Sequence, residues 1–251
     1  MQIVVDSLLT TYQTRGTKKP TVLLMHGWGD DHRTFKGLQA DLAKDYTVVA
    51  VDLPGFGGTQ VPSSVWGLAE YAAFTQKFLA KLGITSLHAV VAHSNGAAVA
   101  IYGVAHGTIK TDKLVLLGAA GIRDRQKGRR LAVKVIAKTG KVATFWLPEH
   151  HRKKLQKKLY GTVGSDMLVV PQLEATFKKT VRQDVQADAK QLKLPTLLIY
   201  GEKDTATPPL YGEIYHNLIA DSTLQTVGGA SHFVHHDQPA QVSGAILEFL
   251  K

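Results

Sequence analysis

Short runs of Val, Ile and Leu alternate with longer amphipathic stretches along most of this chain. Each run is bounded by Gly, Pro, Asp or Lys, a pattern typical of buried parallel strands. The runs occupy residues 22–25, 46–51, 87–92, 114–117 and 196–200. The amphipathic stretches predict helices at residues 34–43, 68–82, 96–106 and 238–250. A weaker alternation over residues 2–12 predicts an antiparallel hairpin at the edge of the sheet. The pattern therefore predicts an α/β fold, with a mostly parallel central sheet and helices on both faces.

The alternation stops at Gly121 and resumes at Pro195. The intervening residues give no strand signal, and they show helix-like patterns at residues 129–137, 149–159 and 173–181. Ligands of open α/β sheets bind outside the C-terminal ends of the strands. We therefore expect a helical lid inserted over those ends. This division predicts a first part of the core at residues 1–121, a basic helical lid at 122–190 and a second part of the core at 191–251.

Composition narrows the class of protein. The chain has 251 residues, of which 44% are hydrophobic, enough for one sizeable globular domain. It contains no cysteine, which excludes disulfides, thiolate zinc sites, iron–sulfur clusters and thiol nucleophiles. No stretch approaches about 18 consecutive apolar residues, so no membrane span is expected. The first residues lack a basic segment before an apolar core, unlike a secretory signal, and we expect a cytoplasmic protein.

The positive charge is concentrated in one segment. The chain carries a net charge of +10, and residues 122–190 hold 17 of the 30 Lys and Arg but only 6 of the 20 Asp and Glu. The rest of the chain is therefore close to neutral. A nucleic-acid-binding protein of the single-stranded type would interleave aromatic residues with its basic ones. That interleaving is missing here, and no nucleic-acid partner is expected.

Residues 92–96, Ala-His-Ser-Asn-Gly, follow an apolar strand and precede a helix rich in small residues. This context is typical of a nucleophile elbow, in which a sharp turn holds the serine in a strained conformation. Small residues two positions away avoid a steric clash there. Ala92 stands where the usual pattern has Gly, and it is still small. Ser94 is therefore the candidate nucleophile, and a helix N-cap is the alternative role for a serine in this position.

A candidate acid and a candidate base each follow a later strand. Asp204 ends the sequence Gly-Glu-Lys-Asp after the predicted strand 196–200, and His232 follows a short apolar run at residues 223–227. A serine hydroxyl is a poor nucleophile at neutral pH and needs a base. His232 supplies that base, and Asp204 fixes its tautomer and stabilises its charged form. The order Ser, Asp, His along the chain is that of α/β-hydrolases.

The loop after the first buried strand supplies a further part of the predicted active site. Developing negative charge on a substrate oxygen needs two backbone N–H groups aimed at it. Asn95 offers one N–H, and Trp28, in the glycine-flanked sequence Gly-Trp-Gly, offers the other. We expect the ring of His26 to hydrogen-bond the loop backbone rather than to act as a base. The residues that flank these positions are our candidates for lining the substrate pocket: His26, Gly27, His93 and Phe233.

Together these motifs resemble the α/β-hydrolase family over essentially the whole chain. The matching segments are residues 26–29, 52–57, 92–96, 201–204 and 229–232. The resemblance implies a catalytic triad of Ser94, Asp204 and His232, an oxyanion hole from the backbones of Trp28 and Asn95, and a lid. No cofactor is expected, since residues 55–58 fit neither the dinucleotide fingerprint nor a P-loop. No metal site is expected either.

Several reactions are compatible with this fold. A serine nucleophile favours acyl transfer to water, and we predict a carboxylic-ester hydrolase acting on a small-molecule ester. A carbon–carbon bond hydrolase of the meta-cleavage type is an alternative, although such enzymes tend to carry Trp where Phe233 stands. A small-molecule receptor that retains the triad is another alternative. Multiple turnovers of an activated ester distinguish an enzyme from a receptor.

The basic segment suggests a more specific substrate. The loop at residues 26–29 and the segment 52–57 are similar to those of esterases that cleave methyl esters of pimeloyl groups on acyl-carrier protein. In those enzymes basic lid residues receive the acidic carrier. The corresponding candidates here are Arg123, Arg125, Lys127, Arg129, Arg130, Arg152, Lys153, Lys154, Lys157 and Lys158. Such a patch steers an acidic protein or an anionic surface toward the site, and a merely solvated lid face is the alternative.

Overall fold

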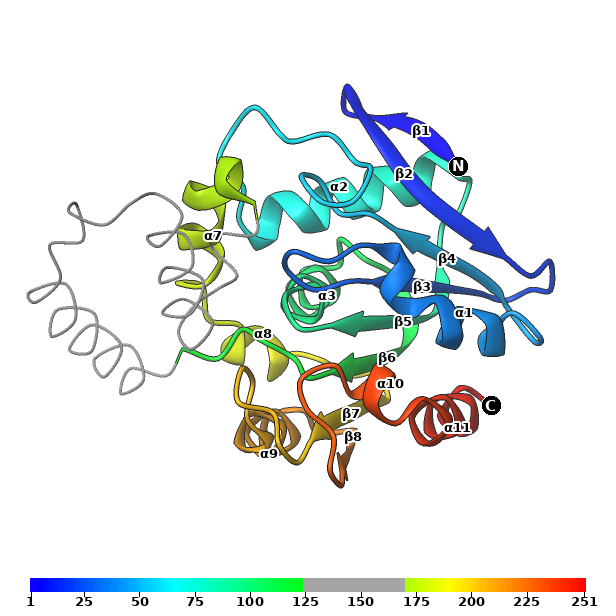
Figure 1. Ribbon diagram of the computed structural model, residues 1–251, viewed down its shortest axis with the longest axis vertical. Helices are drawn as coiled ribbons and strands as arrows, with labels where there is room; N and C mark the ends of the chain where they lie inside the picture. Colours follow the sequence, from blue (N-terminus) through cyan, green and yellow to red (C-terminus); the bar gives the residue numbers. More distant parts are fainter. Residues whose placement is uncertain (124–169) are drawn as a thin grey trace, which may run out of the picture.

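A computed structural model describes residues 1–123 and 170–251. Its centre is an eight-stranded sheet in the order β1-β2-β4-β3-β5-β6-β7-β8, which Figure 1 shows nearly edge-on. The strands are β1 (Gln2–Val5), β2 (Leu8–Arg15), β3 (Thr21–Met25), β4 (Thr47–Val51), β5 (Leu87–His93), β6 (Thr111–Leu117), β7 (Thr196–Gly201) and β8 (Ser222–Val227). All pairings from β4 to β8 are parallel. The predicted α/β sheet is thus confirmed.

The antiparallel edge is the predicted hairpin. Strands β1 and β2 pair with Val5 opposite Leu8, so only Asp6 and Ser7 form the turn. Both have positive φ angles, 46° and 63°, as a two-residue turn between twisted strands requires. Strand β2 continues the sheet by pairing antiparallel with β4. The antiparallel strands β1 and β2 therefore come first in the sequence and form one edge of the sheet.

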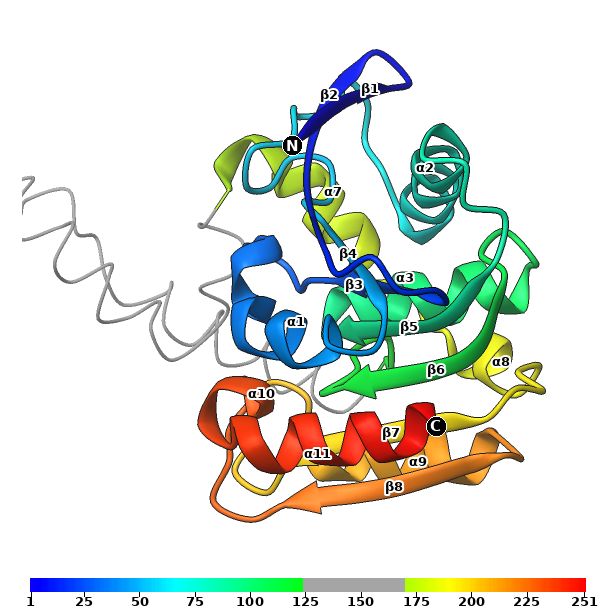
Figure 2. The ribbon, with the colours of Figure 1, turned by 90° about the vertical axis from the view of Figure 1, so that its right-hand side faces the viewer.

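Helices cover both faces of the sheet, as Figure 2 shows. One face carries α2 (Leu68–Lys81), α3 (Asn95–Ala105), α8 (Gln186–Ala189) and α9 (Pro209–Leu218), and the other carries α1 (Lys36–Leu42) and α11 (Pro239–Leu250). Shorter helical segments lie in the loops: η1 (His32–Phe35), η3 (Pro171–Leu173), α7 (Glu174–Thr180) and α10 (Val234–Asp237). None of the described helices is long and apolar enough to cross a membrane.

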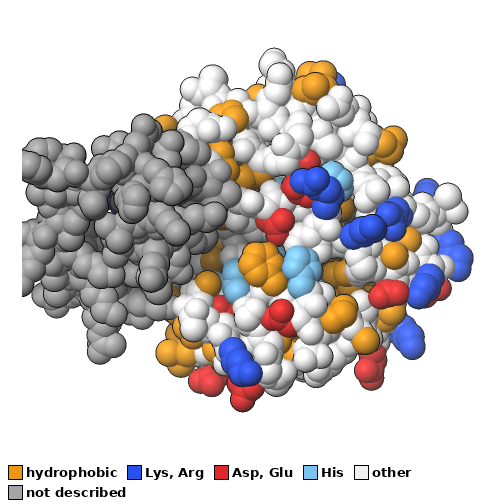
Figure 3. All heavy atoms as spheres, viewed as in Figure 1, with side chains coloured by type: hydrophobic (Ala, Val, Ile, Leu, Met, Phe, Trp, Pro, Cys, Tyr) orange, Lys and Arg blue, Asp and Glu red, His pale blue; other side chains and the backbone are white. Residues whose placement is uncertain are grey.

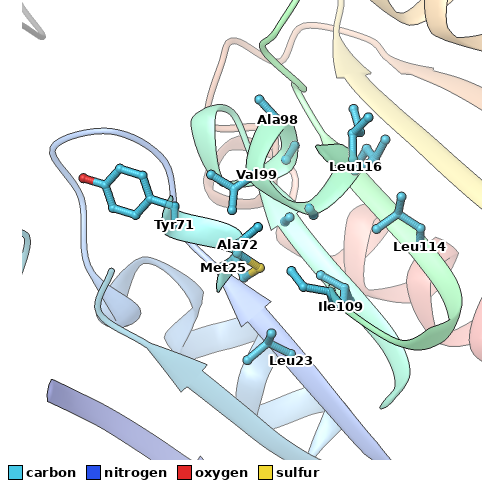
Figure 4. Packing of buried hydrophobic residues seen from close by; sticks show 14 of the residues in the cluster. Leu23, Met25, Tyr71, Ala72, Ala98, Val99, Ile109, Leu114 and Leu116 are labelled. Carbon is cyan, nitrogen blue, oxygen red and sulfur yellow. The ribbon is translucent and has the colours of Figure 1, made fainter. Parts of the chain in front are cut away.

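Alternation along the strands divides the core into two layers. Leu23 and Met25 pack with the α2 and α3 side, whereas Val22 and Leu24 pack with the α1 and α11 side. Figure 4 shows Leu23 and Met25 together with Val99 of α3 on the first of these faces. Each fully buried aliphatic side chain of this kind contributes about 1.5–3 kcal/mol relative to exposure. The buried sheet is thus a rigid support for the loops at its ends.

The segment between β6 and β7 is only partly described. The predicted helix at residues 173–181 corresponds to α7 (Glu174–Thr180). The predicted helices at 129–137 and 149–159 lie outside the described residues. The backbone N–H of Val185 donates to the carbonyl of Gly121 at 2.8 Å, so the chain on either side of this segment is joined near the end of β6.

Candidate active site

Three polar side chains meet at the carboxyl ends of the parallel strands. Ser94 follows β5, Asp204 follows β7 and His232 follows β8. The Nε2 atom of His232 lies 2.9 Å from Ser94 Oγ, and its Nδ1 atom lies 2.8 Å from Asp204 Oδ2. The sequence predicts this association, because parallel strands deliver their ends to one edge of the sheet. The three groups form one continuous hydrogen-bonded line.

The backbone of Ser94 has a conformation that side-chain-bearing residues rarely adopt. Its φ is 52° and its ψ is −116°, which costs on the order of 1–3 kcal/mol. The surroundings enforce it: Ser94 N–H donates to Leu117 O at 3.0 Å, and Ser94 O accepts from Ala97 and Ala120 at 3.1 Å each. The strained turn projects Oγ away from the sheet, toward His232. Ser94 is thus held as an elbow rather than as an ordinary helix cap.

Glycine is needed directly after this turn. A Cβ atom on Gly96 would lie 2.4 Å from the carbonyl oxygen of His26 and 2.7 Å from that of Met25. Both atoms belong to the backbone of β3 and its loop, so they have little freedom to move. The first turn of α3 therefore packs directly against the loop that carries Trp28. This close approach sets the distance between the two predicted oxyanion donors.

Asp204 is buried and fully hydrogen-bonded. Its Oδ1 accepts from the backbone N–H groups of Ala206 at 2.8 Å and Thr207 at 2.9 Å, and its Oδ2 accepts from His232 and from the hydroxyl of Thr207. Burial alone raises the pKa of Asp204, but the hydrogen bonds from His232 and Thr207 outweigh it and hold that pKa below its ordinary value. Asp204 is therefore an ionised acceptor for the imidazole.

Thr207 is a site residue that sequence analysis missed. Its side chain is 5% exposed and lies between Asp204 and His232. The available signal is its position three residues after Asp204, since Asp commonly accepts hydrogen bonds from the backbone two or three residues onward in a turn. That signal predicts the backbone contact but not the hydroxyl contact, which depends on the rotamer of Thr207.

His26 holds the loop that follows β3. The N–H of Leu53 donates to His26 Nε2 at 2.9 Å, so the ring proton is on Nδ1, which lies 2.7 Å from Gly27 O. Burial lowers the pKa of His26 and keeps the ring neutral. The backbone-bonding role predicted for His26 is thus what the structure has. The loop in turn presents Trp28, whose indole lies 4.8 Å from the ring of Phe56 and 5.1 Å from that of Phe177.

A pocket of about 220 Å³ opens beside Ser94. Its described lining includes both predicted oxyanion residues, Trp28 and Asn95, together with Ser94 and His232. The other described lining residues are Ala98, Ala120, Gly121, Ile122, Phe177, Thr180, Val181, Gln183, Ala206, Thr207 and Tyr211. None of these described residues is Lys, Arg, Asp or Glu. The Nδ2 atom of Asn95 is buried and has no hydrogen-bond partner in the described part of the chain.

The four residues predicted to line the pocket lie elsewhere. His26 and His93 are 0% and 1% exposed and engage backbone atoms, and neither they nor Gly27 and Phe233 belong to the described lining. His93 donates from Nε2 to the carbonyl of His232 at 3.0 Å. Phe233 is 39% exposed and lies against the rings of His232 and His236. His26 and His93 point into the core and Phe233 lies at the surface, so this placement does not support the predicted role.

Histidines gather on the outer side of this site. On the face in Figure 3, histidine side chains flank a hydrophobic one. Below that surface, the ring of His93 lies 4.7 Å from that of His232 and 5.0 Å from that of His235. Burial lowers the pKa of His93 well below its ordinary value, and it lowers the pKa of His235 to about 3. Both rings are therefore neutral beside His232 and add no charge to it.

One cluster has the residue types of a metal site. The carboxylates of Asp31 and Asp52 and the ring of His32 have atoms within 4.8 Å of one another. Protein groups already occupy these atoms: His32 contacts Asp52 Oδ1 through its backbone N–H at 2.7 Å and its ring at 2.6 Å, and Gly58 N–H donates to Asp52 Oδ2. Asp31 pairs with Arg33. These bonds give the cluster a structural role in holding the loop.

Comparison with known proteins places this architecture in a family. The family model described as the alpha/beta hydrolase fold matches residues 20–239. An uncharacterised protein of Mycobacterium tuberculosis is 28% identical over 258 residues, covering 92% of this chain and 75% of its own. The pimeloyl-[acyl-carrier protein] methyl ester esterase of Neisseria meningitidis is 28% identical over 240 residues, covering 86% and 88%.

A solved structure agrees with the fold. The meta-cleavage product hydrolase of Pseudomonas fluorescens IP01 superposes with a TM-score of 0.74 at 22% identity, covering 99% of this chain and 96% of that one. The parallel sheet, the strained serine after β5 and the polar residues after β7 and β8 agree with a family match that spans most of the chain. On both grounds, this chain belongs to the alpha/beta hydrolase fold family.

Proposed function

We propose that this protein is a serine hydrolase that cleaves carboxylic esters through an acyl-enzyme on Ser94. The observation that carries the proposal is the line from Ser94 Oγ through both nitrogens of His232 to Asp204, with distances of 2.9 and 2.8 Å. A base within hydrogen-bond reach of the nucleophile, oriented by a third group, is the arrangement that activates a serine.

The geometry suggests a two-step reaction. As Ser94 Oγ attacks the ester carbonyl, its proton moves to His232 Nε2, and the N–H groups of Trp28 and Asn95 stabilise the oxyanion. His232 then gives this proton to the departing alkoxide, which leaves as the alcohol. A water molecule attacks the acyl-enzyme in the same way, its proton passing through His232 back to Ser94 Oγ. The carboxylic acid is released and the enzyme is regenerated.

The pocket favours a small, uncharged acyl group. Its volume of about 220 Å³ and its described lining of apolar and neutral polar residues offer no charged partner for a substrate. A charged acyl group would lose its hydration without compensation there. Aminopeptidase activity is less favoured for the same reason, since a substrate ammonium finds no carboxylate among the described lining residues.

The test is a panel of p-nitrophenyl esters from C2 to C12, combined with labelling by a fluorophosphonate probe. We expect multiple turnovers by the native protein, with a maximum among the short acyl chains. Ser94→Ala should lower kcat by about 10⁴-fold or more and abolish labelling, while the circular dichroism spectrum stays unchanged. A Ser94→Ala variant that keeps a tenth of the native rate contradicts the proposal. A single slow turnover by the native protein would favour the receptor alternative.

A second candidate is an ester carried by an acidic protein. The relative from Neisseria meningitidis is a pimeloyl-[acyl-carrier protein] methyl ester esterase, and the match covers 86% of this chain. The concentration of basic residues at 122–190 is compatible with an acidic carrier. The carbon–carbon hydrolase alternative has weaker support, because the similarity to the meta-cleavage hydrolase is 22% in sequence.

A further inference from the structure

The hydroxyl of Thr207 lies at the junction of the acid and the base. Its Oγ1 is 2.8 Å from Asp204 Oδ2, 2.9 Å from the carbonyl oxygen of Gly118 and 3.1 Å from His232 Nδ1. Thr207 is 5% exposed, so water has little access to these atoms. A threonine hydroxyl has a single proton, and therefore it can donate to only one of the two oxygens at a time.

The carboxylate is the better acceptor for that proton. It carries a negative charge, and charge-assisted hydrogen bonds are shorter and stronger than neutral ones. Its distance to Thr207 Oγ1 is also the shorter of the two. We propose that Thr207 is a positioning residue of the catalytic site, whose hydroxyl donates to Asp204 Oδ2 and fixes the carboxylate against His232. This inference rests on the proposed serine mechanism.

Without this contact, the bond from His232 itself would be the only described hydrogen bond to Asp204 Oδ2. The N–H groups of Ala206 and Thr207 hold Oδ1, and a carboxylate held at one oxygen can rotate about its Cβ–Cγ bond. The hydroxyl of Thr207 blocks that rotation by fixing Oδ2, the oxygen that accepts from His232 Nδ1. The hydrogen bond from Nδ1 to Asp204 Oδ2 orients the His232 ring. The position of its Nε2 relative to Ser94 Oγ therefore depends on Thr207.

The end of β6 encloses the junction. Gly118 has a φ of +49°, and a Cβ atom there would lie 3.3 Å from Asp204 Oδ2, from His232 Nδ1 and from Thr207 Oγ1. Its backbone thus packs directly over the three polar groups. The junction is therefore enclosed on the side of β6, with the hydroxyl of Thr207 between Asp204 and the carbonyl of Gly118.

The hydroxyl also sets the basicity of the pair. A donor to the Asp204 carboxylate spreads its negative charge and weakens its attraction for a protonated His232 ring. Removing the donor makes the carboxylate a stronger partner for the imidazolium. Among the described residues, the titratable rings near His232 are those of His93 and, packed on His93, of His235, and both are buried and neutral. They remain in place when Thr207 is changed.

The test compares two substitutions of one side chain. Thr207→Val replaces the hydroxyl with a methyl group of similar size, and Thr207→Ser keeps the hydroxyl. Thr196→Val is the matched control, because Thr196 is also buried and its hydroxyl donates to the carbonyl of Leu194, at the opposite end of β7. Thr207→Ala serves in place of Thr207→Val if the valine variant does not fold.

Three measurements are made on each variant: kcat and KM for a p-nitrophenyl ester, the pH profile of kcat/KM, and the low-field proton resonance of the His232 Nδ1–H. We expect Thr207→Val to lower kcat by about 10-fold with little change in KM. We also expect the acidic limb of its profile to move to higher pH, and its low-field resonance to shift. Thr207→Ser and Thr196→Val should resemble the native protein in all three.

Specific results would overturn the inference. One is a native rate and pH profile in Thr207→Val. Another is a loss in Thr207→Ser equal to that in Thr207→Val. A third is an acidic limb that moves to lower pH in Thr207→Val, which would make the hydroxyl an acceptor from His232. An equal loss in Thr196→Val would show a general effect of removing a buried hydroxyl. The proton resonance does not depend on turnover, so a failure of the esterase proposal, seen with Ser94→Ala, is distinguishable from a failure at Thr207.

Discussion

Burial keeps several histidines of this protein uncharged, with a consequence for its stability in acid. His235 is 6% exposed and packs 5.2 Å from the ring of Phe35, and burial lowers its pKa from 6.5 to about 3. Its pKa is thus lower in the folded than in the unfolded chain, so the unfolded chain binds more protons over this interval. The folded state therefore loses stability as the pH falls from about 6.5 toward 3, and this contribution is fully present above that window.

We predict that His235→Phe makes the protein less sensitive to acid. Between pH 6.5 and the folded-state value, one such histidine costs about 1.4 kcal/mol per pH unit, and Phe removes that titration while keeping an aromatic ring beside Phe35. The free energy of unfolding, measured in urea at pH 8, 6 and 5, should fall less steeply than in the native protein. The control is His216→Phe at an exposed position, which measures the effect of adding a phenyl ring alone. Equal slopes in all three proteins would contradict the prediction.

Among the elements, the contact between β3 and α3 determines how Ser94 is presented. Gly96 lies in the first turn of α3, with two backbone carbonyl oxygens within 2.7 Å of where a Cβ would be. Gly37 lies in α1 with no atom within 4 Å of that point. Both are helical glycines, but only one has a packing reason to be glycine. Alanine substitutions at Gly96 and Gly37 therefore distinguish the steric cost of a Cβ atom from the gain in helix propensity.

We predict opposite effects for alanine at these two positions. Gly96→Ala forces α3 away from β3 and should lower the free energy of unfolding by about 1–3 kcal/mol, with a larger proportional loss of activity because Asn95 moves too. Gly37→Ala should raise the free energy of unfolding by about 0.5–1 kcal/mol. Urea unfolding followed by circular dichroism measures both. A neutral Gly96→Ala would show that the helix can shift without cost.

The sequence predicts these elements where periodicity is strong. Five apolar runs locate the buried parallel strands, and the run at 87–92 corresponds to β5 (Leu87–His93). Helix α9 (Pro209–Leu218) is not predicted, because Pro208 and Pro209, at its N-cap and first position, indicate a loop. A proline at the first helical position is in fact compatible with a helix, since its missing N–H has no acceptor there.

The sequence predicts which residues of the site follow the ends of strands, but it does not predict where their neighbours' side chains point. Position after a strand brings together Ser94, Asp204 and His232, because topology alone fixes that. Side-chain direction is not fixed by topology, and so His93 is predicted in the pocket but lies in the core. Thr207 is missed for a related reason: its contact depends on how a turn folds back across Gly118, which follows β6.

At the scale of the whole molecule, the positive charge is unevenly distributed along the chain. The basic excess lies at residues 122–190, most of which are outside the described residues. In the described part, Lys178 and Lys179 pair with Glu174 and Glu70. The predicted lid candidates Arg152, Lys153, Lys154, Lys157 and Lys158 lie outside the described residues, and their partner stays a prediction.

We predict that charge at these five positions affects only large acidic substrates. Replacing all five with Gln should lower kcat/KM for an ester on an acidic carrier protein, and the loss should shrink with salt, since exposed charges are screened over about 8 Å at physiological ionic strength. Turnover of the same ester without its carrier should stay unchanged. Equal losses on both substrates would show damage to the protein, and no loss on either would make these residues a solvated surface.

The hydrogen bond between Val185 and Gly121 has an evolutionary consequence. Strands β6 and β7 pair directly, with Leu114 opposite Thr196. The chain leaves the sheet after β6 and comes back to Gly121 at Val185, and α8 then leads it to the start of β7. Recombination between related genes at these two points would exchange everything in between while preserving the register of the sheet. Ser94, Asp204 and His232 lie outside the exchanged part. A lineage with this topology can therefore acquire new substrates by replacing one contiguous stretch of sequence, and laboratory chimeras joined at the same two points should fold.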